Sequence, residues 1–214
     1  MIAALFVEAA GVYSGRPDVD VWDEKRDARL YRGPWPVVCH SPCSRWGRYW
    51  YGGPSAKVRR ERGDDGGCFA AAFSAVRRWG GVLEQPADSS AFAAFAIPRP
   101  VRGGWCRLAH TFNSDVAWTC EVDQGQYGHA ARKRTWLFYV GANPPPALCW
   151  SPSVNMRRLD EGFHSTEERR AARAAGVAPR ARLSTAENLA TPPAFADLLL
   201  SIARSARTTA EAAE

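Results

Sequence analysis

A short apolar run that ends in a tight loop constrains the fold of this chain more than any other feature. Residues 37–39, Val-Val-Cys, follow a proline and predict a buried β-strand, and Ser-Pro-Cys at 41–43 predicts a turn directly after it. In an open α/β sheet, reactive side chains collect in the crevice outside the carboxyl ends of the strands. The position of Cys43 therefore predicts a nucleophile, although a cysteine after a strand also commonly serves as a small buried hydrophobe.

Short apolar runs bounded by turn residues recur along the chain and predict further elements. The further predicted strands are residues 3–10, 19–22, 82–83, 105–111, 116–122 and 136–140. The predicted helices are residues 66–81, 166–175 and 194–204. The fold class that follows is α/β, with an open, twisted, mostly parallel sheet in one domain over residues 1–204 and a disordered tail over 205–214.

Composition favours a single globular domain, since the 214 residues are 46% hydrophobic and 23% charged. No apolar run approaches the roughly 20 residues of a membrane helix, and residues 1–10 lack a signal-peptide pattern. We therefore expect a cytoplasmic protein with no membrane partner.

The six cysteines include no CxxC pair and no disulfide spacing, so we expect reduced thiols. Cys39 with Cys43, or Cys106 with His110, would supply half of a zinc site. Neither pair has a second half, and we therefore expect no bound metal.

Positive charge on this chain is carried almost entirely by arginine. The net charge is +6, and all but three of the 28 Lys and Arg residues are Arg, which suits bidentate contacts to phosphates and bases. After Cys43, arginines alternate with aromatic residues and glycines, a composition typical of a loop that binds phosphates and stacks on bases. The alternative is an aromatic cluster covered by a solvated arginine run. The candidate nucleic-acid-binding residues are Arg45, Arg48, Trp50, Arg59 and Arg60.

Polar side chains also follow other predicted strands. Asp23 comes just past the second strand, where nucleotide ribose hydroxyls are commonly bound, although a solvated turn residue explains it equally well. Glu84 stands at a strand end before a proline, which makes it a candidate for the same crevice as Cys43. Arg132 and Arg134 are two residues apart before a strand, so we expect both guanidinium groups on one face.

In chain order, five segments resemble motifs of the cytosine-C5 DNA methyltransferases. Residues 4–11, Ala-Leu-Phe-Val-Glu-Ala-Ala-Gly, are similar to that family's Asp-Leu-Phe-x-Gly-x-Gly-Gly motif, and Ser-Pro-Cys-Ser at 41–44 is similar to its Pro-Cys-Gln motif. Leu-Glu-Gln-Pro at 83–86 resembles Glu-Asn-Val. Residues 127–134 resemble Tyr-Gly-x-Pro-Gln-x-Arg-x-Arg, and residues 187–193 resemble Gly-Asn-Ser-Val-x-x-Pro. Five ordered matches are more specific than any one of them.

The resemblance implies a Rossmann-like methyltransferase domain that modifies C5 of a pyrimidine in DNA, by default through cytosine methylation. Cys43 would add to C6 of the ring and make C5 nucleophilic. Glu84 would hold or protonate the ring edge at N3. Arg132 and Arg134 would contact the base or a phosphate and lower the pKa of the Cys43 thiol. In a duplex the base would first be flipped out of the stack.

The family's cofactor is S-adenosylmethionine, and the resemblance implies binding residues for it in the first half of the chain and near its end. These residues are Phe6, Glu8, Gly11, Asp23, Asp27 and Asn188. Glu8 and Ala10 replace family glycines, and the stretch between Gly15 and Cys43 has room for about one short element, so we expect a domain truncated in its cofactor half. Residues 141–183 are a reduced insert in place of a target-recognition domain.

Three alternatives stay open from the sequence. In the first, the chain is an enzyme that uses another one-carbon donor or acts on a free pyrimidine nucleotide. In the second, the chain is a non-catalytic DNA-binding or inhibitory protein on a degenerate methyltransferase fold. In the third, the chain is an α/β domain in which Cys43 and Glu84 have only structural roles. The sequence predicts no oligomeric state.

Overall fold

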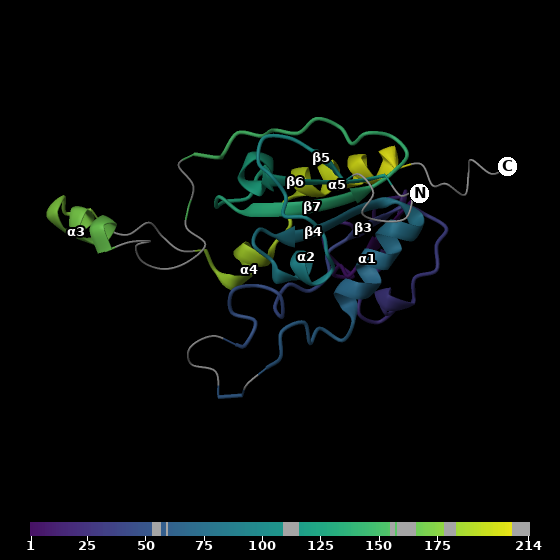
Figure 1. Ribbon diagram of the computed structural model, residues 1–214, viewed down its shortest axis with the longest axis horizontal. Coiled ribbons are helices and arrows are strands. Elements are labelled where there is room, and N and C mark those ends of the chain that lie inside the picture. The colour runs from purple at the N-terminus through teal and green to yellow at the C-terminus, as the bar shows by residue number, and fades with distance from the viewer. Residues whose placement is uncertain are drawn as a thin grey trace.

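One mixed β-sheet forms the centre of the molecule in a computed structural model that describes residues 1–52, 57–58, 60–108, 116–154, 157, 166–177 and 183–206 (Figure 1). Its seven strands lie in the order β2-β1-β3-β4-β7-β6-β5. The strands are β1 (Ile2–Leu5), β2 (Val19–Trp22), β3 (Val37–Cys39), β4 (Gly81–Pro86), β5 (Cys106–Leu108), β6 (Ala117–Asp123) and β7 (Arg134–Val140).

The sheet divides into a parallel half and an antiparallel half. β2, β1, β3 and β4 are parallel, whereas β7 pairs antiparallel with β4, β6 with β7, and β5 with β6. The expectation of an α/β fold is confirmed, but the mostly parallel sheet is restricted to the first four strands. Between β6 and β7 the chain returns within residues 124–133, too short a connection for the crossover that a parallel pair requires.

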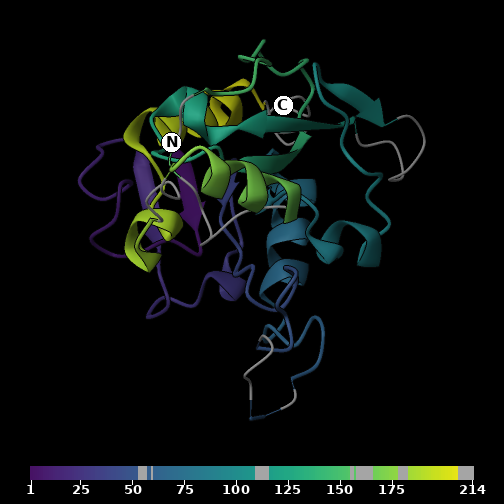
Figure 2. The same cartoon turned by 90° about the vertical axis from the view of Figure 1, so that its left-hand side faces the viewer.

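Two amphipathic helices cover opposite faces of the sheet, and each closes its own apolar cluster. α1 (Cys68–Trp79) buries Phe69 and Phe73 on one face, and α5 (Pro193–Ser205) buries Phe195 and Leu199 on the other. Figures 1 and 2 show the sheet between these two helices. The remaining helices are η1 (Ala28–Leu30), α2 (Ser90–Ala94), η2 (Gln124–Tyr127), α3 (Thr166–Ala174) and α4 (Thr185–Leu189). None of the helices in the described ranges has the length and apolarity that crossing a membrane requires.

β1 is shorter than its apolar sequence predicts. It ends at Leu5 and not at residue 10, because Phe6 adopts a left-handed conformation with φ 60° that an extended strand cannot accommodate. A turn follows, in which the backbone N–H of Gly11 donates to the carbonyl of Glu8 at 3.0 Å. The motif-like segment after β1 is therefore a compact loop.

The strand order places a topological switch point between β1 and β3. The chain leaves β1 for β2 on one side and then crosses to β3 on the other side, so a crevice opens at the carboxyl ends of β1 and β3. The connection over residues 6–18 contains no helix, and η1 is the helical element between β2 and β3. Ligand-binding positions of an open α/β sheet are therefore to be sought in this crevice.

The C-terminal boundary differs slightly from the predicted one. α5 extends through Ser205 and Ala206 is 2% exposed, so order reaches beyond residue 204. The rest of the predicted tail, residues 207–214, lies outside the described residues. Within the predicted insert at 141–183, residues 141–154, 157, 166–177 and 183 are described, and Leu148 packs into the cluster beneath α5.

Candidate functional site

Cys43 follows β3, and Glu84 lies inside β4, just past the point where the pairing of β4 with β3 ends; β4 is longer than the strand predicted over residues 82–83. Cys39 of β3 pairs in register with Leu83 of β4, so His40 and Glu84, one residue further on, occupy the same row of the sheet. Cys43 follows in the turn after β3 and is partly exposed. The structure therefore brings the predicted nucleophile and the predicted carboxylate to one edge.

A buried amide holds the Cys43 loop against β4. Gln85 is 0% exposed, and its Nε2 donates to the carbonyl oxygen of Ser41 at 2.6 Å and to the hydroxyl of Ser41 at 3.0 Å. The hydroxyl of Ser89 donates to Gln85 Oε1 at 3.2 Å. Because these groups are buried, breaking any one bond leaves a desolvated polar atom without a partner. The turn that contains Cys43 is thus fixed at its first residue.

Trp46 fastens the other side of the same turn. Its carbonyl oxygen accepts from the backbone N–H of Ser90 at 2.9 Å and from the Ser90 hydroxyl at 2.8 Å. Its indole N–H donates to Asp65 Oδ2 at 2.7 Å, and Asp65 also accepts from the backbone N–H of Phe69 in the first turn of α1. Cys43 is therefore held between two anchored residues, as a preorganised reactive group needs to be.

The electrostatic surroundings of Cys43 involve Glu84 and Lys133. Burial raises the pKa of the Cys43 thiol, and the negative charge of Glu84 raises it further, while the positive charge of Lys133 lowers it. The thiol is therefore protonated at neutral pH. A nucleophilic role requires that the proton pass to a base when a substrate arrives.

The carboxylate of Glu84 is held by two polar side chains, neither of which is an arginine. Its Oε2 lies 3.2 Å from His40 Nδ1, and its Oε1 accepts from Gln124 Nε2 at 3.2 Å. Gln124 also donates to the hydroxyl of Thr135 at 2.9 Å, and its own Oε1 is buried without a hydrogen-bond partner within the described residues. Each oxygen of Glu84 keeps a further lone pair for a ligand.

His40 is engaged on both ring nitrogens. The hydroxyl of Tyr13 lies 2.8 Å from Nε2, and Glu84 lies against Nδ1. A cysteine hydrolase needs a histidine nitrogen free to take the thiol proton. His40 offers none to Cys43, and the arrangement is therefore not that of a Cys-His hydrolase.

The structure does not bring the two predicted arginines to Cys43. Arg134 binds Glu121 at 2.7 Å and Asp88 at 3.2 Å, and Arg132 lies 3.6 Å from Asp123. These ion pairs tie the start of β7 mainly to its neighbour β6. The cation whose charge acts on Cys43 is Lys133, the residue between them, whose Nζ donates to the carbonyl of Asn188 at 2.9 Å.

The residues implied for S-adenosylmethionine are largely engaged in local contacts. Asp23 Oδ1 accepts from the backbone N–H of Arg26, and both carboxylate oxygens of Asp27 accept from the Arg29 side chain. Asp20, the acid inside β2, is bound by Trp22 and Arg26.

At the first-motif positions, Phe6 packs against the apolar cluster of α1 and Glu8 is exposed. Tyr13 and His40 meet across the switch point, so protein side chains connect the loops after β1 and β3 where a cofactor would be sought. Asp27 is committed to Arg29, whereas Asp23 accepts one backbone hydrogen bond, so the residues named for an adenosyl cofactor fit it incompletely.

The segment after Cys43 projects from the body of the molecule (Figures 1 and 2). Tyr49 is 54% exposed with the Arg48 guanidinium 5.4 Å from its ring centroid, and Arg62 lies 5.0 Å from the ring centroid of Trp50. Arg45 is partly exposed and Arg60 exposed, whereas Arg59 lies outside the described residues. Trp46 is buried, and Trp50 and Tyr51 are partly exposed and pack edge to face. This part of the chain therefore combines accessible arginines with a partly buried aromatic pair.

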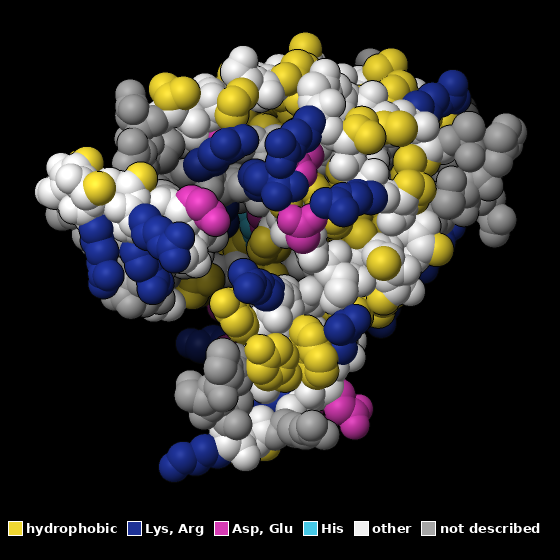
Figure 3. Space-filling view, turned by 60° about the vertical axis from the view of Figure 1, so that its left-hand side comes forward, with side chains coloured by type: hydrophobic (Ala, Val, Ile, Leu, Met, Phe, Trp, Pro, Cys, Tyr) yellow, Lys and Arg dark blue, Asp and Glu magenta, His cyan; other side chains and the backbone are white. Residues whose placement is uncertain are grey.

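Figure 3 turns the carboxyl ends of the parallel strands toward the viewer. The surface is hollowed near its middle, and a histidine side chain is visible there between basic and acidic side chains. His40 and Glu84 have side-chain exposures of 13% and 12%, so both retain limited contact with solvent. The candidate site is therefore open, not sealed in the core.

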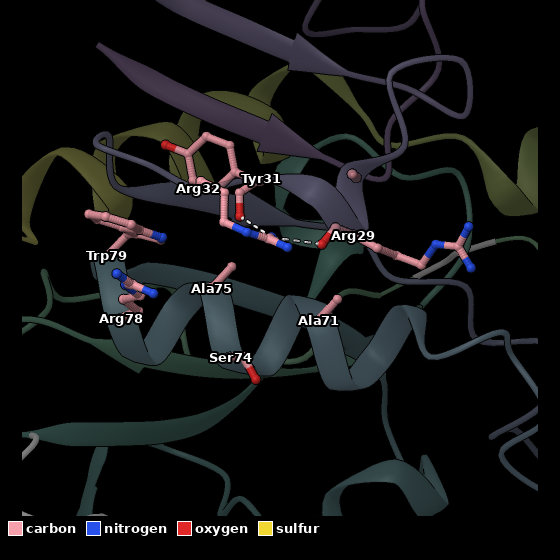
Figure 4. Close-up of a pocket in the computed structure, with 9 residues that line it drawn as sticks. Arg29, Tyr31, Arg32, Ala71, Ser74, Ala75, Arg78 and Trp79 are labelled. Atoms are coloured by element: carbon pink, nitrogen blue, oxygen red, sulfur yellow. Dashed lines mark hydrogen bonds between the residues drawn. The ribbon is translucent and has the colours of Figure 1, made fainter.

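A second hollow of about 140 Å³ lies between η1 and α1, away from the strand ends (Figure 4). Arg32 lies over it next to Tyr31, Arg78 and Trp79 line it from the end of α1, and the side chain of Arg29 extends away from it. Arg29 is bound by Asp27, and Arg32 donates to the carbonyls of Arg29 and Tyr31. These contacts indicate that Arg29 and Arg32 stabilise the junction of η1 with α1.

Comparisons with family models, curated proteins and solved structures find no match to this chain. Among the described residues, no three His, Cys, Asp or Glu side chains are grouped to hold a metal ion.

The sequence reasoning missed four residues of this site, namely Tyr13, His40, Gln124 and Lys133. His40 carried a usable signal, because it directly follows the same strand that led to Cys43.

Proposed function

We propose that this chain modifies C5 of a pyrimidine in DNA through a covalent adduct with Cys43, on a Rossmann-like methyltransferase domain. The observation that carries the proposal is the placement of Cys43 and Glu84. The thiol is partly exposed on a doubly anchored turn, and the carboxylate of Glu84, whose charge acts on that thiol, is free of arginine partners among the described residues. Both lie just past the parallel pairing of β3 with β4, where open α/β sheets bind ligands.

In the proposed chemistry, the thiol proton of Cys43 passes to Glu84 as the sulfur forms a bond to C6 of the pyrimidine. The electron pair of the C5–C6 double bond moves toward C5 and into the ring, and Glu84 returns the proton to N3. The ring then carries a nucleophilic carbon at C5, and no net charge is added. Lys133 favours the thiolate as it develops, because its positive charge acts on Cys43.

The adduct step needs no donor, and the proposal is therefore independent of the identity of the one-carbon source. The resemblance implies S-adenosylmethionine, whereas the engagement of Asp23 and Asp27 favours another donor. Isothermal titration calorimetry separates the two: micromolar binding of S-adenosylmethionine supports the first, and no heat at millimolar cofactor supports the second.

The test is covalent capture on DNA that carries pyrimidin-2-one in place of cytosine, within randomised flanking sequence. This base accepts a thiolate at C6 without a donor. We expect an adduct that survives SDS with the wild type and none with Cys43→Ser, while Cys106→Ser, at an exposed cysteine, behaves like the wild type. Single-stranded DNA, duplex DNA and the free nucleotide are compared in parallel.

A non-catalytic DNA-binding protein is the second candidate, favoured by the exposed Arg48 and Tyr49 together with the engagement of Asp27 by Arg29. It predicts tight DNA binding with no adduct on any of the three substrates. That outcome would replace the enzymatic proposal.

A further inference from the structure

Tyr13, His40 and Glu84 form a hydrogen-bonded row that the reaction proposed above does not yet use. The three side chains come from the loops after β1 and β3 and from β4. Their polar atoms are separated by 2.8 Å between Tyr13 Oη and His40 Nε2 and by 3.2 Å between His40 Nδ1 and Glu84 Oε2. Tyr13 is 2% exposed, and within the described part of the chain its hydroxyl has no other hydrogen-bond partner.

The direction of these hydrogen bonds follows from the chemistry of Tyr13. Burial, followed by repulsion from Glu84, raises the pKa of the Tyr13 phenol far above its usual range, so the phenol keeps its proton. A phenol that keeps its proton can donate to a neighbouring acceptor. Nε2 of His40 then accepts, and in the neutral imidazole the proton resides on Nδ1.

The direction of the bond between Tyr13 and His40 also determines the hydrogen bond that Glu84 receives from His40. With Tyr13 as the donor to Nε2, the N–H of a neutral His40 lies on Nδ1 and is directed at Oε2, and Gln124 donates to Oε1. Both oxygens of Glu84 thus face donors, an arrangement that locks the orientation of the carboxylate. The charges of Arg16, Asp197 and Cys39 also shift the pKa of Tyr13, and those of Glu84 and Lys133 shift the pKa of Cys43. Within the described residues, no arginine is paired with Glu84.

We propose that His40 is a positioning residue for Glu84 and that Tyr13 fixes the His40 tautomer, so that Glu84 is presented to the pyrimidine edge as a proton acceptor. This inference rests on the proposed function. His40 does not touch the base or take a proton from Cys43. It acts only through the carboxylate, and Tyr13 acts only through His40.

Two variants of His40 separate positioning from a general structural role. The amide of asparagine reaches the place of Nδ1, and His40→Asn therefore keeps the donor to Glu84 while it loses the contact with Tyr13. The amide of glutamine reaches the place of Nε2, and His40→Gln keeps the contact with Tyr13 while it loses the donor to Glu84. Each variant removes one of two hydrogen bonds, so their unfolding midpoints should be similar.

The measurement is the rate of adduct formation on DNA with pyrimidin-2-one, together with the dissociation constant for the same DNA. We expect His40→Asn to remain within about threefold of the wild-type rate, whereas His40→Gln falls by about tenfold to a hundredfold, the effect of one hydrogen bond to a charged group. DNA affinity should be unchanged in both. Equal rates for the two variants, whether both fall or neither falls, overturn the inference while the proposed function stands.

Nitrogen-15 NMR of labelled His40 provides an independent readout. We expect the Nδ1–H tautomer in the wild type and a mixture of tautomers in Tyr13→Phe, which lacks the donor to Nε2. An Nε2–H tautomer in the wild type contradicts the proposed role of Tyr13. If the wild type forms no adduct at all, the proposed function fails and the role of His40 in it falls with it, a result distinct from unequal or equal variant rates.

Discussion

Glu84 and Glu121 are two carboxylates of the same sheet with opposite surroundings. Glu121, in β6, accepts from Arg102 at 2.6 Å, from Arg134 at 2.7 Å and from the Trp136 indole at 3.0 Å. Burial alone would raise the pKa of Glu121, but these hydrogen bonds outweigh it and lower the pKa to about 2. The carboxylate of Glu121 is thus fully occupied by side chains of the protein.

Glu84 has a similar side-chain exposure, 12% against 7% for Glu121, but the described residues provide it with no arginine. Its partners are a histidine and a glutamine, and its negative charge acts on the thiol of Cys43. A carboxylate with saturated ion pairs stabilises the fold, whereas one with remaining acceptor capacity beside a nucleophile is available for chemistry. The comparison predicts that substitutions at the two positions affect different properties.

The largest effect is expected for Glu84→Gln. The amide keeps the size of the side chain but cannot take the thiol proton, so adduct formation on DNA with pyrimidin-2-one should slow by about a hundredfold or more. The free energy of unfolding should fall by about 1 kcal/mol, less than for Glu121→Gln, because the new NH2 group faces one of the two donors but no ion pair with arginine is lost. Rates are measured by gel quantification of the SDS-stable adduct. A variant as fast as the wild type would remove Glu84 from the mechanism.

Glu121→Gln should show the reverse. Loss of the carboxylate leaves Arg102 and Arg134 without their shared partner and should lower the free energy of unfolding by about 2–3 kcal/mol. The adduct rate should stay at the wild-type value. Urea titration measures the first quantity. A large loss of activity without a loss of stability would contradict the structural role assigned to Glu121.

The same variant should change the acid stability of the protein. The pKa of Glu121 is lowered from 4.5 to about 2 on folding, so its contribution is present above pH 4.5 and is lost as the pH falls toward 2. The wild type should therefore lose stability relative to Glu121→Gln across that window. Parallel unfolding curves of the two proteins from pH 5 to pH 2 check the sign.

Gln85→Met should have an intermediate effect. Methionine fills a similar volume but leaves the buried carbonyl of Ser41 without its donor, so stability should fall by about 1–3 kcal/mol and adduct formation should slow as the Cys43 turn loosens. Gln126→Met, at an exposed glutamine, is the matched control and should be neutral. Equal behaviour of the two variants would show that the Gln85 contact does not position the loop.

The smallest effect is expected on the projecting surface. Arg48→Ala should weaken DNA binding a few-fold and reduce the slope of log affinity against log salt by about 1, as the loss of one phosphate contact does. Arg32→Ala, beside the hollow between η1 and α1, should leave both quantities unchanged. Affinities are measured by fluorescence anisotropy at several salt concentrations. Identical salt slopes for Arg48→Ala and the wild type would exclude a phosphate contact at Arg48.

Local patterning predicted several elements closely. The strand over residues 19–22 was predicted with the bounds that β2 has, and the predicted helix over 66–81 contains α1 between its glycines. Residues 3–10 were misjudged, since apolar composition continues past Leu5 while the backbone at Phe6 turns left-handed. Apolarity alone does not determine where an extended backbone ends.

The arginine pair shows a different limit. Alternation correctly separated Arg132 and Arg134 from Lys133, but it did not say which face meets the thiol. The acids Glu121 and Asp123 on β6 attract the arginines, and this pairing depends on the register of β6 against β7. Such a choice between partners cannot be made from the spacing of charges along one strand.

The sequence by itself determined the strand that leads to Cys43, the turn that exposes it and the strand that ends near Glu84, because short-range sterics and hydrophobic alternation act within a few residues. Only the tertiary structure decided that Tyr13 meets His40 from 27 positions away and that His40 meets Glu84 from 44 positions away. Hydrogen bonds reach about 3 Å, so their partners are set by sheet order and register, which the whole chain fixes together.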